Sequence, residues 1–268
     1  MSSMLAMPPM LASSAAPLDE VVGPDVSAIV TEDDTPLDNF PSEKQQRLLT
    51  EALYSSWSGP PAQEGERRSF LAAANVGLFA TPKEPPLVPD VLLSVDVALH
   101  EAWWQKEHRS YFLWEFGKPP DVVIEIVSNR EGDELGLKRR RYAWMRVAYY
   151  VVWDPAGHLG GPALRAFEMR GHTYVPMEDA WFEAVGLGLS AWEGVHEGRH
   201  DRWLRWHTAD GNVVPTGAER AERERTRAER ERTRAEREQA RAEREQARAE
   251  RLAAQLRALG IEPDENGS

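Results

Sequence analysis

Residues 118–155, KPPDVVIEIVSNREGDELGLKRRRYAWMRVAYYVVWDP, have the pattern of a strand, a loop, a helix and a second strand in that order. The first apolar run, residues 122–127, contains a single polar side chain, that of Glu125. Alternate side chains of a strand face opposite sides, so this run would place apolar residues on both faces. That pattern is typical of a strand covered on both sides, as in a sheet that lies between helices. The segment therefore predicts an α/β fold.

Glu125 is a carboxylate in an otherwise apolar strand, and a buried carboxylate is costly unless a partner compensates its charge. Either a cation of the fold or a bound metal ion is expected beside it. In the helix pattern that follows, Leu135, Lys138, Tyr142 and Met145 share one stripe, which should face the sheet. A lysine can lay its alkyl stem along apolar surface and bring its ammonium group to a polar pocket. We therefore expect Lys138 to lie next to Glu125.

A second acidic residue stands at the entrance of an upstream strand pattern. In LVPDVLLSVDVAL, residues 87–99, Asp90 directly follows Pro89. If this strand neighbours the one that carries Glu125, the two carboxylates can converge on one divalent cation. Mg²⁺ is usually held by one or two carboxylates together with phosphate and water. Asp121 is a poorer partner for Glu125, because four residues along one strand separate them by roughly 13 Å.

These motifs together resemble a known family. A proline-aspartate pair at a strand start, a glutamate in a second strand and a nearby lysine are similar to the PD-(D/E)XK nuclease superfamily. More narrowly, VPDVLLSVDV, PPDVVIEIVSN, GLKRRRYA and YYVVWDP resemble the Uma-type family of bacterial restriction endonucleases, over roughly residues 39–216. The resemblance implies a restriction-endonuclease-like fold, with a central mixed β-sheet flanked by helices. The lysine that usually lies two residues after the glutamate is replaced here by Val127, and the resemblance moves its role to Lys138.

The resemblance also implies an activity, that of an endonuclease that hydrolyses phosphodiester bonds of DNA with Mg²⁺, or Mn²⁺, as cofactor. Asp90 and Glu125 would hold the metal ion with the carbonyl group of Ile126, and Lys138 would assist catalysis. Two alternatives stay open. In the first, Glu125 and Lys138 form a structural ion pair, and Asp90 only caps a turn. In the second, the protein is a catalytically silent binding or scaffold protein with a nuclease fold, assembled through its C-terminal helix.

Composition limits these readings. The formal net charge is −12, which argues against binding nucleic acid by bulk electrostatics. The chain has no cysteine, which excludes disulfides, thiolate zinc sites and cysteine nucleophiles, and suits a reducing cytoplasm. No apolar run approaches the roughly 20 residues that cross a bilayer. We expect a cytoplasmic protein without a membrane partner.

The chain is expected to contain four segments. Residues 1–38 are rich in proline, serine, alanine and acids, and predict a disordered segment. Residues 39–216 correspond to the nuclease-like domain. Residues 217–260 repeat AERERTR and then AEREQAR, which predicts a continuous charged helix of roughly 65 Å. Its repeat has an alanine seam instead of the two apolar positions of a strong coiled coil, so any homo-oligomer would form near its leucine-containing end. Residues 261–268 are expected to be a disordered tail.

Four further segments of the sequence allow structural predictions. Residues 41–57 predict a helix that covers the sheet, with Ser42 as its N-cap. The pattern after residue 163 predicts a β-meander that extends the sheet. Residues 179–214 are expected to be irregular edge structure with short helical pieces. The tryptophans of residues 101–117 are expected to pack in the core rather than to stack on bases.

The sequence HEGRH, residues 196–200, matches the zinc-protease pattern in which two histidines share one face of a helix. Gly194 and Gly198 would weaken such a helix by about 1 kcal/mol each relative to alanine. No third-ligand signature accompanies the pattern. We therefore do not expect a zinc site at His196 and His200.

Overall fold

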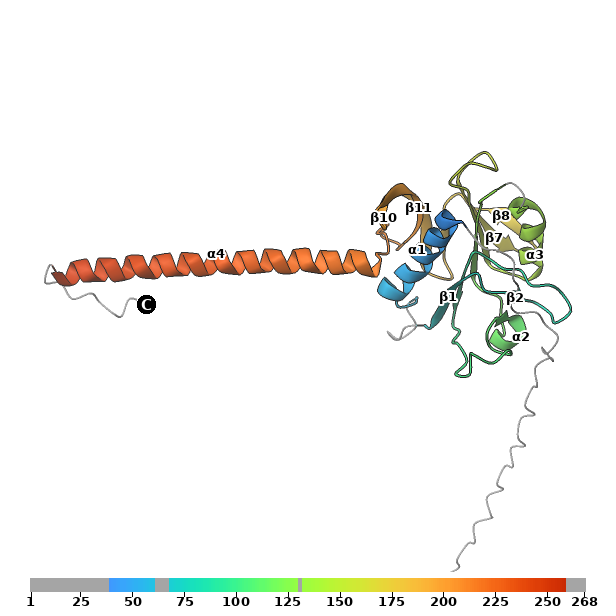
Figure 1. The fold of residues 1–268 in the computed structure, drawn as a ribbon, viewed down its shortest axis with the longest axis horizontal. Coiled ribbons are helices and arrows are strands. Elements are labelled where there is room, and N and C mark those ends of the chain that lie inside the picture. The colour runs from blue at the N-terminus through green and yellow to red at the C-terminus, as the bar shows by residue number, and fades with distance from the viewer. Residues whose placement is uncertain (1–38, 61–67, 130–131, 259–268) are drawn as a thin grey trace, which may run out of the picture.

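The computed structural model describes residues 39–60, 68–129 and 132–258. Over these residues a body of sheets and short helices is followed by one long helix that leaves it (Figure 1). The disorder expected for residues 1–38 and 261–268 lies outside the described residues.

A mixed β-sheet forms the centre of the body. Within the described residues it contains six strands in the order β1-β3-β5-β6-β7-β8. Their bounds are β1 (Phe70–Ala74), β3 (Val91–Val95), β5 (Val122–Ile126), β6 (Tyr149–Trp153), β7 (Leu164–Arg170) and β8 (Thr173–Pro176). Strands β5 and β6 are parallel, and every other neighbouring pair is antiparallel. Every residue of β3, β5 and β6 is buried, as the apolar pattern on both faces predicted.

Helices cover both faces of this sheet, and each face has its own hydrophobic core. On one face α1 (Phe40–Ser56) packs Leu49 and Leu53 against Ile124 of β5. On the other face Tyr142 and Met145 pack against the opposite side of the same strands. The α/β architecture with a central mixed sheet flanked by helices, which the sequence predicted, is confirmed.

The first helix begins earlier than predicted. Its N-cap is Asn39, whose side-chain oxygen accepts a hydrogen bond from the amide of Ser42 at 3.0 Å. Ser42 therefore lies inside the first turn, and its assignment as the N-cap was wrong. Pro41 fits the same turn, because the amide that proline lacks would have no helical partner there.

The segment after β5 forms two consecutive helical pieces. A π-helical turn, η2 (Glu134–Lys138), continues directly into α3 (Arg139–Trp144). Together they bring the predicted stripe onto the sheet. Upstream, a short parallel pair β2 (Leu78–Phe79) and β4 (Tyr111–Phe112) leads into the four-residue helix α2 (Leu113–Phe116).

Residues 179–214 were expected to be irregular, and this was wrong. Three antiparallel strands form a second sheet there: β9 (Trp181–Phe182), β10 (Leu187–His196) and β11 (Arg199–His207). Two glycines of this region, Gly188 and Gly194, lie within β10. A Cβ atom at Gly188 would be 2.3 Å from the ring of His207, so the missing side chain makes room for its cross-strand neighbour.

The zinc-protease pattern lies in this hairpin. Glu197 and Gly198 have φ angles of +48° and +76°, as in a two-residue hairpin turn. His196 ends β10 and His200 lies on β11, so the two histidines do not share a helix face. The expectation that this pattern is not a zinc site is consistent with that geometry.

Two tryptophans depart from the expected core packing. Trp103 and Trp104 are 49% and 83% exposed in the turns before β4. Trp114 does pack, beside Phe112. The difference arises because residues 101–109 form successive turns instead of a helix with a buried face.

The long charged C-terminal helix is confirmed as α4 (Gly217–Ala258). At 1.5 Å per residue its 42 residues extend for about 60 Å, and none of its described side chains is buried. Near its start the helix is joined to the body, where Gly217 donates its amide to Glu51 of α1 at 2.8 Å. Figure 1 shows the rest of the helix projecting away from the body.

Candidate active site

Strand register brings Asp90 and Glu125 to the same place. Strands β3 and β5 are antiparallel, and Val91 pairs with Ile124. The next positions in this register are Asp90 and Glu125. The carboxylate of Asp90 continues the ladder, because its Oδ2 accepts the amide of Ile126 at 2.6 Å. Two acidic side chains, distant in sequence, therefore stand on adjacent strand ends.

Glu125 is buried, with 1% of its surface exposed, and both carboxylate oxygens have donors. Oε2 accepts from Nζ of Lys138 at 2.8 Å, and Oε1 accepts from the hydroxyl of Tyr142 at 2.6 Å. Both donors come from the stripe that follows the strand, in η2 and α3. The side chain of Lys138 is 31% exposed, so its ammonium group lies between the buried carboxylate and solvent.

Burial dominates the electrostatics of this pair. Burial raises the pKa of Glu125 to about 7, against the opposing effect of the Lys138 ammonium, and the nearby charge of Asp90 raises it further. For Lys138, burial alone would lower the pKa, but the charge and hydrogen bond of Glu125, together with the charges of Glu134 and Asp90, outweigh burial, and the pKa is raised. Lys138 therefore stays charged at neutral pH, whereas Glu125 titrates near it.

An amide pair orients Asp90, and sequence reasoning missed it. Gln46 of α1 is 4% exposed and donates its Nε2 to Oδ1 of Asp90 at 3.0 Å. Its Oε1 accepts from Asn75, just after β1, at 3.0 Å. The only hint of Gln46 in the sequence was its place as a polar residue close to the leucines that α1 buries. Nothing in the local pattern linked it to Asp90, because the contact joins separate elements.

Sequence reasoning also missed Glu134, the first residue of η2. It is 5% exposed, and its Oε1 lies 3.6 Å from Nζ of Lys138. Its Oε2 is buried without a hydrogen-bond partner in the part of the chain that the structure describes. A buried carboxylate oxygen without a partner is costly and requires a water molecule, a cation or a ligand. The loop is closely fitted to this carboxylate, because a Cβ atom at Gly132 would be 1.7 Å from Oε1.

The donor groups at this site fit a divalent cation. Asp90 and Glu125 supply carboxylate oxygens, which Mg²⁺ and Mn²⁺ prefer. In a strand, the amide and carbonyl of one residue point to the same edge, so the carbonyl of Ile126 faces the edge where its amide meets Asp90. A cation here would also offset the repulsion between the two acids. Among the described residues, no three acidic or histidine side chains form a complete metal cluster, so water and substrate would supply the other ligands.

Asp121, the poorer candidate, lies apart from this arrangement. Its Oδ2 accepts from Lys118 at 2.5 Å and from the amide of Val95 at 2.8 Å. These contacts are at the opposite end of β5 from Glu125. Asp121 therefore fixes the start of the strand.

The chain also matches a known family. A family model described as "Uma2: Putative restriction endonuclease" matches residues 24–178. The chain belongs to the Uma2 family. The family description indicates a nuclease, and nucleases of restriction-endonuclease-like families generally use divalent metals and act on DNA. None of the curated proteins and none of the solved structures compared with the Uma2 chain matches it. None of its described helices is both long and apolar enough to cross a membrane.

Proposed function

We propose that this Uma2 protein is a metal-dependent endonuclease that hydrolyses phosphodiester bonds of DNA at the site formed by Asp90, Glu125 and Lys138. The observation that carries the proposal is the meeting of two acids on adjacent strand ends beside a partly exposed lysine. Membership of the family supplies the nuclease class.

Asp90, Glu125 and the carbonyl of Ile126 would hold Mg²⁺ or Mn²⁺. Such an ion supplies Lewis-acid polarisation of the scissile phosphate and lowers the pKa of water. Gln46 would position Asp90 through its 3.0 Å hydrogen bond. Tyr142 would position Glu125, because its hydroxyl donates to one oxygen and leaves that oxygen's other lone pair free.

Lys138 would act on the substrate. An ammonium group has three donors, and one of them is used by Glu125. The exposed part of the side chain can direct another donor to a phosphate oxygen as negative charge builds up there. The unpartnered Oε2 of Glu134 would accept a proton from the attacking water, because no described protein group competes for it.

A second function has a specific observation in its favour. Both oxygens of Glu125 already have protein donors, which also fits a structural ion pair. In that case the protein would be a nuclease-fold binding or scaffold protein that assembles through α4. Self-association through the end of α4 is compatible with either function, because Leu252 and Leu256 are 51% and 37% exposed there.

Plasmid nicking separates the two functions. Purified full-length protein is incubated with supercoiled plasmid and Mg²⁺ or Mn²⁺, beside Glu125→Gln and Asp90→Asn. These amides keep the size of each side chain but remove the charge, so we expect nicking to fall by about a hundredfold or more. Asp121→Asn is the matched control and should nick like the wild type, since Asp121 contacts Lys118 outside the site.

Two results would exclude the proposed enzymatic function. One is equal nicking by wild type and the two site variants, which would indicate a contaminating nuclease. The other is no nicking by folded wild type at any metal concentration. Crystals soaked in Mn²⁺ give a readout independent of activity, with anomalous density expected between Asp90 and Glu125.

A further inference from the structure

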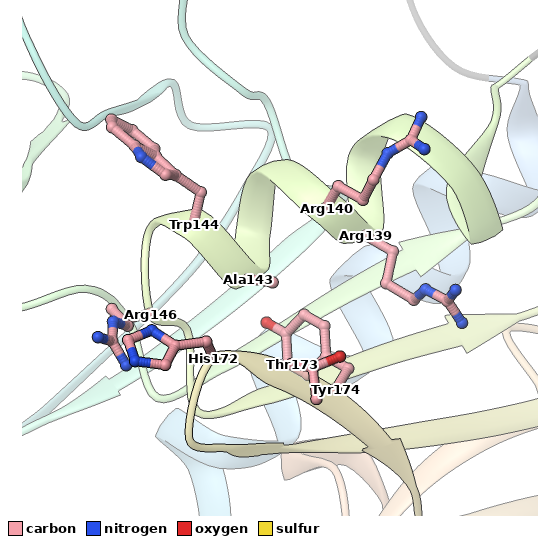
Figure 2. A pocket seen from close by; sticks show the side chains of 8 residues that line it. All are labelled: Arg139, Arg140, Ala143, Trp144, Arg146, His172, Thr173 and Tyr174. Atoms are coloured by element: carbon pink, nitrogen blue, oxygen red, sulfur yellow. The ribbon is translucent and has the colours of Figure 1, made fainter.

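A pocket of about 520 Å³ lies between α3 and the β7–β8 hairpin, outside the site described above (Figure 2). Its lining combines basic and aromatic side chains from these elements: Arg139, Arg140, Ala143, Trp144, Arg146, His172, Thr173 and Tyr174. Figure 2 shows Arg139 and Arg140 at one end of the pocket, and Arg146 with His172 at the other. None of the lining residues is acidic.

The pocket is a basic surface on an acidic protein. Among the described residues, Arg139, Arg140 and Arg146 take part in no ion pair. Glu168 of β7 pairs with Arg170 at 2.8 Å and does not line the pocket. Three guanidinium groups without a described acidic partner around one pocket form a local positive surface on a chain of net charge −12, and such a surface suits an anionic ligand.

Two of these arginines are held in place. The guanidinium of Arg139 lies 5.3 Å from the centre of the Phe167 ring, on which it stacks. Arg146 donates one Nη1 hydrogen bond to the carbonyl of Gly171 at 2.7 Å, and its backbone has a φ of +65°. A guanidinium group has five N–H donors, so Arg146 keeps most of them for a ligand. Arg140 is exposed to solvent.

Aromatic groups at the rim favour a nucleic-acid strand over a small anion. Trp144 is 58% exposed, and His172 is exposed on the hairpin turn. Exposed aromatic rings beside guanidinium groups are the combination that binds single strands, in which bases stack while the backbone follows the positive charge. A free phosphate ion would use the arginines and leave the indole without a role.

The pocket follows the candidate active site directly along the chain. Lys138, which contacts Glu125, is the last residue of η2, and Arg139, which lines the pocket, is the first residue of α3. We propose that the arginine pocket, defined by Arg139, Arg140 and Arg146, binds the phosphodiester backbone of a nucleic-acid strand next to the Glu125–Lys138 site. The cleavage that this binding would serve rests on the proposed function, whereas the binding itself can be measured without it.

The test is fluorescence anisotropy of a labelled oligonucleotide with full-length protein in EDTA, so that no cleavage occurs. Single-stranded and duplex probes are titrated over a range of salt concentrations. We expect Arg140→Glu to weaken binding about tenfold or more at low salt. Arg146→Ala should reduce the slope of log K against log salt by about 0.7 for single strands or 0.9 for duplex. Arg232→Glu on the exposed part of α4 is the matched control and should bind like the wild type.

Trp144 tests whether the ligand is a nucleic acid. Trp144→Ala should weaken binding of the single-stranded probe about tenfold, and Trp144→Phe should restore most of it, because phenylalanine keeps a stacking face. Inorganic phosphate and a poly-glutamate peptide are the competing probes. Displacement of the oligonucleotide by the peptide at equal charge would assign the pocket to an acidic protein and overturn the proposal.

The outcomes distinguish failure of this proposal from failure of the proposed function. If Arg140→Glu and Arg146→Ala bind with the affinity and salt slope of the wild type, the proposed binding by the arginine pocket is overturned, even if the protein nicks plasmid. Failure of the wild type to bind either oligonucleotide would overturn it as well. Pocket-dependent binding without nicking in Mg²⁺ or Mn²⁺ would support the pocket and reject the nuclease activity. If the protein shows both pocket-dependent binding and nicking, the Arg140→Glu variant should nick DNA with a raised KM and a nearly unchanged kcat.

Discussion

The chemistry of single residues centres on Glu125, a carboxylate in a strand buried on both faces. Burial raises its pKa to about 7, and the charge on Asp90 adds to the effect. Lys138 and Tyr142 reduce the cost of its ionised form but do not remove it. The site therefore holds a destabilising charge at neutral pH, as expected where a cation or substrate completes the structure.

This charge predicts a pH dependence of stability in metal-free protein. The pKa of Glu125 is higher folded than its ordinary value of 4.5, so the folded state binds the proton more tightly. Stability should therefore fall as the pH rises from about 5 to 8, by roughly 2–3 kcal/mol relative to Glu125→Gln. Lys138 stays charged throughout this range and adds no slope. Urea unfolding of both proteins in EDTA measures their difference in the free energy of unfolding. A difference that stays constant from pH 5 to 8 would contradict the raised pKa.

At the scale of elements, the start of α4 is fixed by several contacts at once. Thr216 and Glu219 form a capping box, in which each side chain accepts the backbone amide of the other. Glu219 also accepts from the buried Arg205 of β11 at 2.7 Å. Arg205 in turn lies 4.9 Å from the centre of the Trp192 ring and donates to the carbonyl of Val214. These contacts set the direction in which the long helix leaves the body.

Removing this anchor should destabilise the body and weaken the start of the helix. In Glu219→Gln the hydrogen bonds to the charged carboxylate weaken, and Arg205 keeps a buried charge with less compensation. We expect a loss on the order of 2 kcal/mol in the free energy of unfolding. Glu222→Gln, on the exposed surface one turn later, should change it by no more than about 0.5 kcal/mol.

The same contact gives a second signature at acid pH. Burial alone would raise the pKa of Glu219, but the hydrogen bonds from Arg205 and from the Thr216 amide, together with the nearby arginine charges, outweigh burial, and the pKa is lowered. Its contribution is therefore present above the ordinary value of 4.5 and is lost as the pH falls through the lower, folded pKa. The difference in the free energy of unfolding between wild type and Glu219→Gln should therefore become smaller as the pH falls below 4.5. A gap that persists in strong acid would show that the ion pair does not anchor α4.

At the scale of the whole molecule, a nuclease-like body carries a polar rod. Repeated Arg-to-Glu pairs at i, i+4, such as Arg227–Glu231 and Arg241–Glu245, run along α4. Each such pair contributes roughly 0.2–0.5 kcal/mol in low salt, and less in this orientation than with the acid first. Most of the helix has only an alanine seam, and its leucines lie near its C-terminal end.

We expect those leucines to associate two copies of the chain. Light scattering with size exclusion should give a concentration-dependent larger mass for the full chain. A chain lacking residues 227–268, which keeps the capping box and Glu219, should be monomeric. Leu252→Glu with Leu256→Glu should act like the truncation, because charge at the seam opposes close packing. Identical masses for all three proteins would exclude assembly through α4.

Local periodicity in the sequence determined the central features. Alternation predicted a strand buried on both faces, and helical spacing placed Lys138 on the stripe that faces Glu125. The position of Asp90 at a strand entrance predicted that it could meet Glu125 if the strands were neighbours. These inferences held because each depends on residues within one element or on a simple register between two.

Tertiary structure alone decided the remaining features. Gln46 reaches Asp90 from another layer, and the buried Glu134 depends on a π-helical turn that ordinary helical spacing does not describe. The second sheet was missed, and within it Gly188 makes room for the ring of His207 on the neighbouring strand, a contact that no local pattern records. The arginine pocket needs α3 and the β7–β8 hairpin side by side. Contacts between distant elements depend on how the whole chain packs, and single-element patterns carry no information about that packing.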